Sequence, residues 1–201
     1  MDRFRATFIV LFLAWALPRG YYRIRGRGKV QEKVREKWAI PARILLGLPF
    51  MVGLALFIFH PQALRRTNFP ISDFWRWTGA VIFAFASALM IWVHVTLGKN
   101  FSSELRIRSD QELVTWGPYR YIRHPMYTAF FLLTIGMGLL SANGLIGAGV
   151  LGVCILILFR VHTEEEMMAR AFGERYRQYA ATTGRFLPRL RGPALPDQRL
   201  E

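Results

Sequence analysis

The sequence has a single cysteine in 201 residues, and its acidic residues are also scarce. Cys154 lies inside an apolar run, so the chain lacks both the paired cysteines of a disulfide framework and the clustered thiols of a cysteine-rich metal site. Aspartate and glutamate together number 13, against 27 lysines and arginines, which gives a net charge of +14. We therefore predict no disulfide and no metal site.

The sequence also lacks the low hydrophobicity of a disordered chain, because 53% of its residues are hydrophobic and only 20% are charged. This apolar fraction exceeds the average for soluble domains and disfavours an ordinary soluble protein. Long uncharged runs alternate with clusters of arginine, which is typical of a polytopic membrane protein. The basic charge is then explained by topology and by attraction to anionic lipid, and no nucleic-acid partner is predicted.

Five apolar runs predict five transmembrane helices and an all-α fold: 8–17, 44–59, 77–97, 126–140 and 145–159. Several are shorter than the roughly 20 residues that cross a bilayer, so flanking aromatic and arginine side chains must lie at the interface or the bilayer must thin. Residues 141–144 are turn formers and predict a tight hairpin over 126–159. We expect residues 1–97 to hold three helices and a basic loop, and residues 98–201 to hold this hairpin and a C-terminal helical segment.

The first apolar run has an alternative interpretation as a signal peptide, since Arg3 and Arg5 precede it and Ala14-Trp15-Ala16 resembles a cleavage site. Cleavage would leave the eight basic residues between positions 19 and 37 to be translocated. Such a block normally stays in the cytoplasm, so a retained first helix is favoured.

Five crossings predict an orientation. Residues 18–43, 98–125 and 160–201 would share one side of the membrane and carry most of the basic side chains. The other side keeps Arg3, Arg5, Arg65, Arg66 and Arg76. By the positive-inside rule, the first side is cytoplasmic and the N-terminus is outside.

The first polar stretch expected to carry chemistry is Gln111 to Tyr127, which leads directly into the fourth apolar run. Pro125 suits the first turn of a helix because its missing N–H would be unbonded there in any case. His124 then occupies the N-cap, beside backbone donors that favour an anionic group. As an alternative, the same residues could be an interface anchor, with His124 as a cap, Arg123 snorkelling and the tyrosines forming an aromatic belt.

The second polar stretch, Arg160 to Tyr176, follows the fifth apolar run. Arg160 and Glu164 share a helix face and could form an exposed ion pair of little energetic value. Because Arg160 ends an apolar run, where a cation is costly, it is also a functional candidate that could hold a substrate carboxylate. Met167, Met168 and Phe172 are predicted to pack rather than to bind a cofactor.

Together these stretches resemble the isoprenylcysteine carboxyl methyltransferase family, especially its small prokaryotic members with five helices. The resemblance covers residues 95–190 and rests on Leu97-Gly98-Lys99-Asn100-Phe101-Ser102, Leu113-Val114, Gly117-Pro118-Tyr119, Arg123-His124-Pro125-Met126-Tyr127, Arg160 with Glu164-Glu165, and Phe172-Gly173-Glu174-Arg175-Tyr176.

The resemblance implies a multi-pass integral membrane enzyme, in a prokaryotic inner membrane, that uses S-adenosylmethionine in a cytoplasmic pocket and methylates a lipophilic acceptor entering from the bilayer. Residues 98–201 would form the catalytic region, with a cofactor loop before the hairpin, and no obligate protein partner is implied. Arg160 would orient the acceptor, and Glu164 would contact the cofactor and belong to the catalytic site. The other cofactor-binding residues would be Gln111, Glu112, Leu113, Val114, Tyr119, His124, Pro125, Met126 and Tyr127. Relatives often have histidine at Gln111, a difference that backbone contacts would tolerate.

The acceptor stays open at this point. It could be a prenylated cysteine, and the superfamily also includes phospholipid N-methyltransferases and small-thiol S-methyltransferases. Sterol reductases share the helical arrangement. The non-enzymatic alternative is a basic membrane scaffold that binds anionic lipid or a partner. An amine or thiol acceptor would need a base, and His124 or a glutamate could serve.

Overall fold

The computed structural model describes residues 2–25, 30–33, 39–101, 106–108 and 112–189. Its contacts divide the chain into two compact units, each discontinuous in sequence. The first unit comprises residues 1–16, 36–88 and 129–159, and the second comprises residues 17–35, 89–128 and 160–201. The division of roles expected at residue 97 concerns function and remains a prediction.

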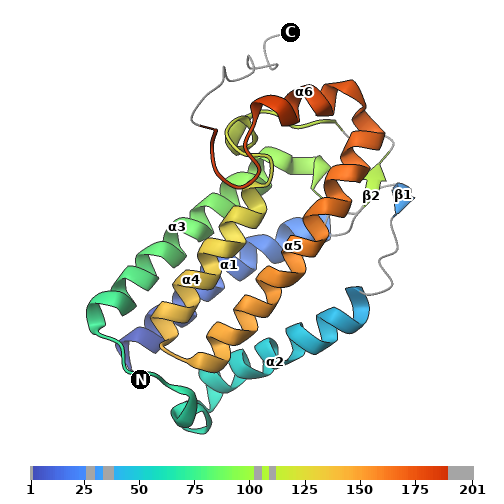
Figure 1. Ribbon diagram of the computed structural model, residues 1–201. Coiled ribbons are helices and arrows are strands. Elements are labelled where there is room, and N and C mark those ends of the chain that lie inside the picture. The colour runs from blue at the N-terminus through green and yellow to red at the C-terminus, as the bar shows by residue number, and fades with distance from the viewer. Residues whose placement is uncertain (1, 26–29, 34–38, 102–105, 109–111, 190–201) are drawn as a thin grey trace. The chain divides into compact units, whose positions relative to one another are not determined.

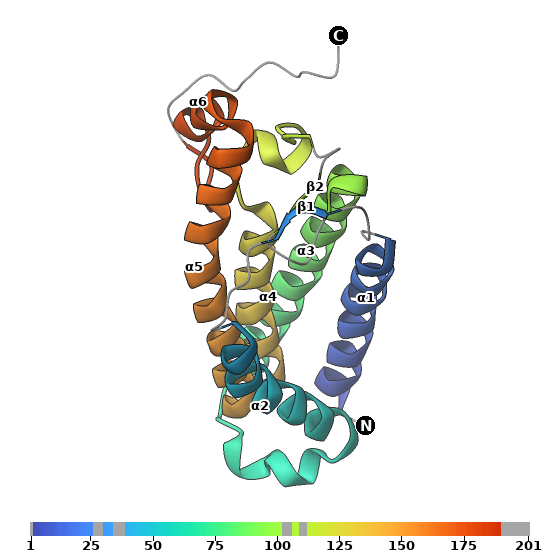
Figure 2. The same cartoon turned by 90° about the vertical axis from the view of Figure 1, so that its right-hand side faces the viewer.

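Helices dominate the described residues (Figure 1): α1 Arg3–Arg25, α2 Ala39–Phe59, α3 Asp73–Leu97, α4 Pro125–Ser141, α5 Gly144–Phe172 and α6 Glu174–Thr182. Each predicted apolar run lies within one of the helices α1 to α5, and the all-α class is confirmed. The same described residues include three short 3-10 helices: η1 Pro61–Thr67, η2 Gly98–Asn100 and η3 Gly117–Arg120. The sequence did not predict the short antiparallel ladder of β1 Val30–Lys33 and β2 Arg106–Arg108 in the second unit (Figure 2).

The number of membrane crossings is only partly supported. Among the described residues, α3 and α5 are long and apolar enough to span a bilayer. The sharply bent pair of residues 44–59 and 61–67 would add a third span if it is counted as one. Helix α4, at 17 residues, is about 26 Å long and shorter than a typical hydrocarbon core. The chain is an integral membrane protein by these spans, and five crossings remain a proposal.

Aromatic side chains form the core of the first unit. Phe8 is fully buried, and the centroid of its ring lies 4.8 Å from that of Phe57 and 5.8 Å from that of Phe83. These three rings come from α1, α2 and α3. The burial of large aromatic side chains contributes strongly to packing energy, so this cluster holds three helices together.

Two glycines let α3 and α4 touch in the first unit. A Cβ on Gly136 would lie 2.7 Å from the Phe83 nitrogen and 2.9 Å from the Gly79 oxygen. A Cβ on Gly79 would lie 2.6 Å from the Leu139 Cβ. Small residues at helix contacts allow this close approach in membranes, where van der Waals packing drives helix association.

Asn143 fixes the predicted turn between α4 and α5, which Figure 1 shows as a tight hairpin. Its side chain is fully buried, and its Oδ1 accepts hydrogen bonds from the backbone nitrogens of Leu145 (3.1 Å) and Ile146 (3.3 Å). Asn143 therefore caps the N-terminus of α5. Its Nδ2 donates to Thr67 Oγ1 at 2.8 Å and to Asn68 Oδ1 at 2.7 Å, which ties the turn to the end of η1.

Candidate active site

Helix α4 begins as the sequence predicted. Pro125 is its first residue, and the backbone nitrogens of Tyr127 and Thr128 each donate to the His124 carbonyl at 3.0 Å. His124 therefore occupies the N-cap position. Its side chain is buried, at 6% exposed, and its ring Nε2 lies 3.1 Å from Glu165 Oε1. The histidine thus contributes its backbone to the cap and its ring to an ionic cluster.

A C-terminal strap, residues 183–186, lies along the segment that precedes α4. The backbone nitrogens of Arg123 and His124 donate to the carbonyls of Gly184 (2.8 Å) and Arg185 (3.0 Å). The hydroxyl of Thr128 donates to the Phe186 carbonyl at 2.8 Å. The strap is therefore anchored mainly through its own carbonyl groups, by donors at the start of α4.

Arg123 is a structural residue and does not snorkel to a polar surface. Its Nε donates to Glu165 Oε1 at 3.1 Å, and its Nη1 donates to the carbonyls of Ala180 (2.5 Å) and Thr183 (2.6 Å). Its side chain is only 13% exposed. The anchor interpretation is wrong for this residue, because its guanidinium joins α5, α6 and the strap.

Glu165 is the centre of this cluster. Its carboxylate accepts hydrogen bonds from Arg123 Nε, from Arg185 Nε at 3.2 Å and from Arg185 Nη2, and it also contacts His124. The Glu165 side chain is 15% exposed, so this charge is held mostly away from bulk water by its partners. Desolvated carboxylates are costly unless they are paired, and here the pairing joins α5 to the α4 start and the strap.

Three consecutive glutamates point in three directions, because each residue turns a helix by about 100°. Glu164 accepts a hydrogen bond from the Tyr127 hydroxyl, whereas Glu165 contacts Arg123, His124 and Arg185. Glu166 is exposed and lies 3.0 Å from His162. Only the first two carboxylates are therefore directed at the residues that begin α4.

Glu164, Tyr127, Tyr119 and Arg160 form a second polar group. The negative charge of Glu164 acts on both tyrosine hydroxyls, and the Arg160 guanidinium acts on Tyr127. Burial, reinforced by Glu164, raises the pKa of Tyr119 well above its ordinary value. Tyr119 is therefore a neutral hydrogen-bonding group, and Glu164 and Arg160 supply charges of both signs to one site.

The residues of the predicted cofactor-binding segment 111–114 differ in how far they are described and buried. Gln111 lies outside the described residues. Glu112 is exposed, and its backbone nitrogen donates to Asn100 Oδ1 at 3.1 Å. Leu113 and Val114 are buried at 7% and 6% exposed. Met126, also in the predicted set, is part-buried in the first turn of α4.

Leu113 packs against Tyr176 and Tyr179 of α6, together with Met168 and Phe172 at the end of α5. The methionines and Phe172 are packing residues, as predicted. The Tyr179 hydroxyl donates to the Tyr119 carbonyl at 2.7 Å, which connects α6 to η3. Helix α6 thus holds the segments of residues 113 and 119 in place.

Tyr176 has a buried hydroxyl oxygen with no hydrogen-bond partner among the described residues. Burial and then the charge of Glu165 raise the pKa of this phenol, so it remains a neutral donor. A buried hydroxyl without a partner carries a desolvation cost, which a ligand that accepts a hydrogen bond would remove.

Sequence reasoning found the two stretches and missed several of the residues that connect them. Glu165, Arg185, Tyr176 and Tyr179 were not predicted as site residues. Glu165 could have been found from the sequence, because three consecutive glutamates on a helix direct their carboxylates to three different sides. No sequence pattern indicated that Arg185 would return to Glu165 from the strap.

Known proteins resemble this chain in sequence and in fold. Residues 79–170 match the model of the isoprenylcysteine carboxyl methyltransferase family. A protein-S-isoprenylcysteine O-methyltransferase of Tribolium castaneum is 34% identical over 101 residues, which cover 49% of this chain and 36% of that protein. The Homo sapiens protein of the same name is 32% identical over 139 residues, which cover 67% of this chain and 46% of that protein. The resemblance stated from the sequence is confirmed.

A solved structure of a eukaryotic intramembrane Ras methyltransferase has the same fold, with a TM-score of 0.53 at 22% identity. The similarity covers 92% of this chain and 63% of that one, so the shared fold extends well beyond residues 79–170. The chain spans less than half the length of the two curated relatives described above.

Proposed function

We propose, from the match of residues 79–170 to the model of the isoprenylcysteine carboxyl methyltransferase family, that this chain transfers a methyl group from S-adenosylmethionine to a lipophilic acceptor in the membrane. Two sets of contacts carry the proposal. Glu164 contacts Tyr127, and Glu165 contacts Arg123 and His124. These contacts join the two polar stretches that flank the hairpin. We further propose five crossings in a prokaryotic inner membrane, with this site at the cytoplasmic face.

The described residues fit S-adenosylmethionine on two observations. Glu164 supplies a carboxylate that complements the positive charge of a sulfonium and an amino group. The hydroxyl of Tyr176, beside Leu113, has no hydrogen-bond partner within the described ranges and offers a donor to a ligand. Leu113, Val114, Tyr119, His124 to Tyr127 and Glu164 would hold the cofactor together with Gln111 and Glu112. When bound, the cofactor supplies a methyl group activated by its positively charged sulfur.

The residues of the chain would then work mainly by positioning and by excluding water. Arg160 presents a planar guanidinium, which can hold an acceptor carboxylate through two parallel hydrogen bonds. A carboxylate acceptor needs no proton removed, so the tyrosine hydroxyls can remain neutral donors throughout. Arg123, Glu165 and the strap would keep the start of α4 fixed around the reacting groups.

Binding of S-adenosylhomocysteine tests the cofactor assignment. We expect Glu164→Gln to weaken binding by the full chain in detergent about 10- to 100-fold, since hydrogen bonds to charged groups contribute about 1.5–3 kcal/mol. Titration calorimetry measures the affinity. Glu166→Gln is the matched control, because Glu166 neighbours the site on the same helix but is exposed.

Other outcomes would contradict the proposal in distinct ways. Unchanged affinity in Glu164→Gln would remove this carboxylate from the cofactor site. Binding of NADPH instead of S-adenosylhomocysteine by the unaltered chain would favour a reductase, and binding of neither would favour a basic membrane scaffold.

A transfer assay tests Arg160 and the acceptor. With radiolabelled S-adenosylmethionine, we expect methylation of a prenylcysteine analogue, and a loss of transfer in Arg160→Ala that exceeds any loss of cofactor affinity. Arg160→Lys keeps the charge and loses the forked geometry, so full activity there would argue for charge alone. Incorporation only into phospholipid amines or small thiols would replace the carboxyl acceptor with those classes.

A further inference from the structure

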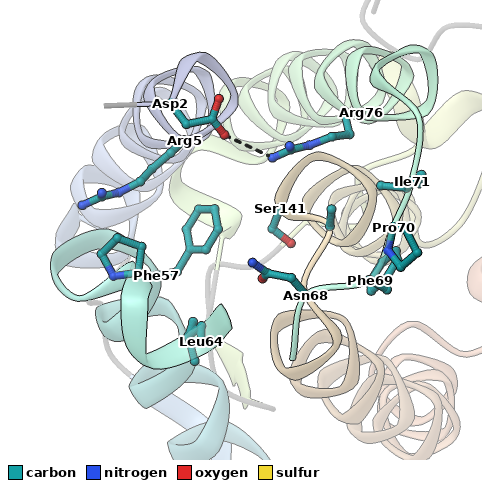
Figure 3. A pocket seen from close by; sticks show the side chains of 12 residues that line it. Asp2, Arg5, Phe57, Leu64, Asn68, Phe69, Pro70, Ile71, Arg76 and Ser141 are labelled. Carbon is teal, nitrogen blue, oxygen red and sulfur yellow. Dashed lines mark ion pairs between the residues drawn. The ribbon is translucent and has the colours of Figure 1, made fainter. Parts of the chain in front are cut away.

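A pocket of about 400 Å³ lies within the first unit, where α1 begins and where α2 and α4 end (Figure 3). None of its lining residues belongs to the segments assigned to methyl transfer. Its polar side chains include Asp2, Arg5 and Arg76, together with Asn68 and Ser141. A cavity that gathers two part-buried arginines needs an explanation, because a cation removed from water is costly unless it is paired.

Arg76 is fixed in place with donors to spare. Its Nε donates to the Leu140 carbonyl at 3.2 Å, and its guanidinium carbon lies 3.8 Å from the ring centre of Phe4. Figure 3 shows the Asp2 carboxylate facing this guanidinium, at 3.6 Å, which is longer than a hydrogen bond. An arginine has five N–H donors, so these contacts leave several for an acceptor in the pocket.

The charge around the pocket is positive. The starts of α1 and α3 and the η1 segment carry five arginines but only Asp2 and Asp73 as described acidic side chains. Asp73 is already paired with Arg3. Arg5 donates to the Ile58 carbonyl at the end of α2, and its Nε is buried without a hydrogen-bond partner in the described part of the chain. The surplus charge therefore favours an anionic ligand.

The other part of the lining is apolar. It includes Phe57 from α2, Leu64 from η1, and Phe69 and Ile71 from the segment before α3. Figure 3 shows Phe57 and Leu64 apart from the segment of Phe69 and Ile71, with Ser141 between them. A small hydrated anion gains nothing from such walls, whereas the glycerol and first acyl carbons of a lipid would bury apolar surface there.

We propose that this pocket binds the headgroup of an anionic phospholipid. The phosphate would accept hydrogen bonds from Arg76 within the positive field of Arg5. Asp2, which is exposed and only loosely paired, would accept a hydrogen bond from a headgroup hydroxyl. The first acyl carbons would contact the apolar lining formed by Phe57 and Leu64. This site is independent of the proposed methyl transfer.

Native mass spectrometry of the full chain in detergent tests the proposal, with phosphatidylglycerol as the probe. We expect one lipid to be retained most tightly, and Arg5→Gln with Arg76→Gln to weaken its retention at least about tenfold. The matched control is Arg65→Gln with Arg66→Gln, which removes the same charge from the same end of the first unit without touching the pocket lining. Equal losses in the two double variants would overturn the site in favour of general electrostatic attraction.

Two further measurements identify the source of the phosphate without depending on the variants. Hydrogen exchange of the unaltered chain should slow in residues 64–71 in phosphatidylglycerol bilayers relative to phosphatidylcholine bilayers, and slowing confined to other segments would overturn the proposal. Inorganic phosphate at matched concentration should not slow exchange there. Equal slowing by inorganic phosphate would replace the lipid with a free anion.

Discussion

At the scale of single residues, several part-buried polar groups of this protein lie in clusters in which each has more than one partner. Glu165 has Arg123, His124 and Arg185, and Asn143 uses both ends of its amide in a fully buried turn. Such clusters cost desolvation energy, and they are destabilising chiefly when one member is removed. Each cluster therefore stabilises the fold only while all of its members are present.

Glu165→Gln tests this dependence. We expect the free energy of unfolding to fall by about 2–3 kcal/mol, because Arg123 and Arg185 would lose a charged partner in a part-buried setting. Trypsin should also cut faster after Arg185, since the strap would be held less firmly. Thermal denaturation in detergent and mass analysis of the fragments measure the two effects.

Glu166→Gln is the comparison for this experiment. Glu166 and its partner His162 are both mainly exposed, so its loss should change stability by less than about 0.5 kcal/mol. If the two variants behaved alike, Glu165 would have no special role in anchoring the strap.

The contacts of single side chains were the features that the sequence predicted least well. Pro125 and His124 at the start of α4 could be predicted, because the N-cap and first-turn preferences are local. The partners of Arg123 could not, since Ala180 and Thr183 lie nearly 60 residues further along and contribute backbone carbonyls, which every residue has. Glu164 was predicted from the family resemblance, whereas Glu165 beside it became evident only from the fold.

At the scale of helices, hydrophobic runs predicted where each helix lies, and glycine determines how closely two of them approach. The predicted run 77–97 lies inside α3, which begins four residues earlier at Asp73. The contact of α3 with α4 at Gly79 and Gly136 was not predicted, because neither run shows which helix its glycine will face. Their complementarity exists only once the helices are adjacent.

Gly136→Ala tests the helix contact. An added Cβ would lie 2.7 Å from the Phe83 nitrogen, and backbone atoms cannot yield as a flexible side chain can. We expect a loss of about 1–3 kcal/mol in the free energy of unfolding, measured by thermal or denaturant titration in detergent.

Gly147→Ala in α5 is the matched control, because no atom of the residues that the structure describes lies within 4 Å of its added Cβ. Alanine is the better helix former, so this variant should be neutral or more stable by up to about 1 kcal/mol. Equal stability of the two variants would mean that α3 and α4 are less closely packed than described.

At the scale of the whole molecule, the distribution of arginine predicts an orientation that labelling can test. In a Cys154→Ala background, we expect Gln178→Cys to react only when the cytoplasmic side is opened, and Arg66→Cys to react from the outside. Both positions are exposed, whereas Asn143 is fully buried and unsuitable for labelling. Reaction of both cysteines from one side would contradict the five-crossing topology.

The contact between Gly79 and Gly136 also limits how a substrate dissolved in the bilayer can travel. A prenyl or acyl chain entering sideways between two helices needs a gap at least one methylene wide. The backbones of α3 and α4 leave no room there even for a single methyl group. The interface between α3 and α4 is therefore closed to lateral diffusion at the level of the two glycines. Any route for a lipophilic acceptor must pass elsewhere, because opening this interface would require the two helices to separate.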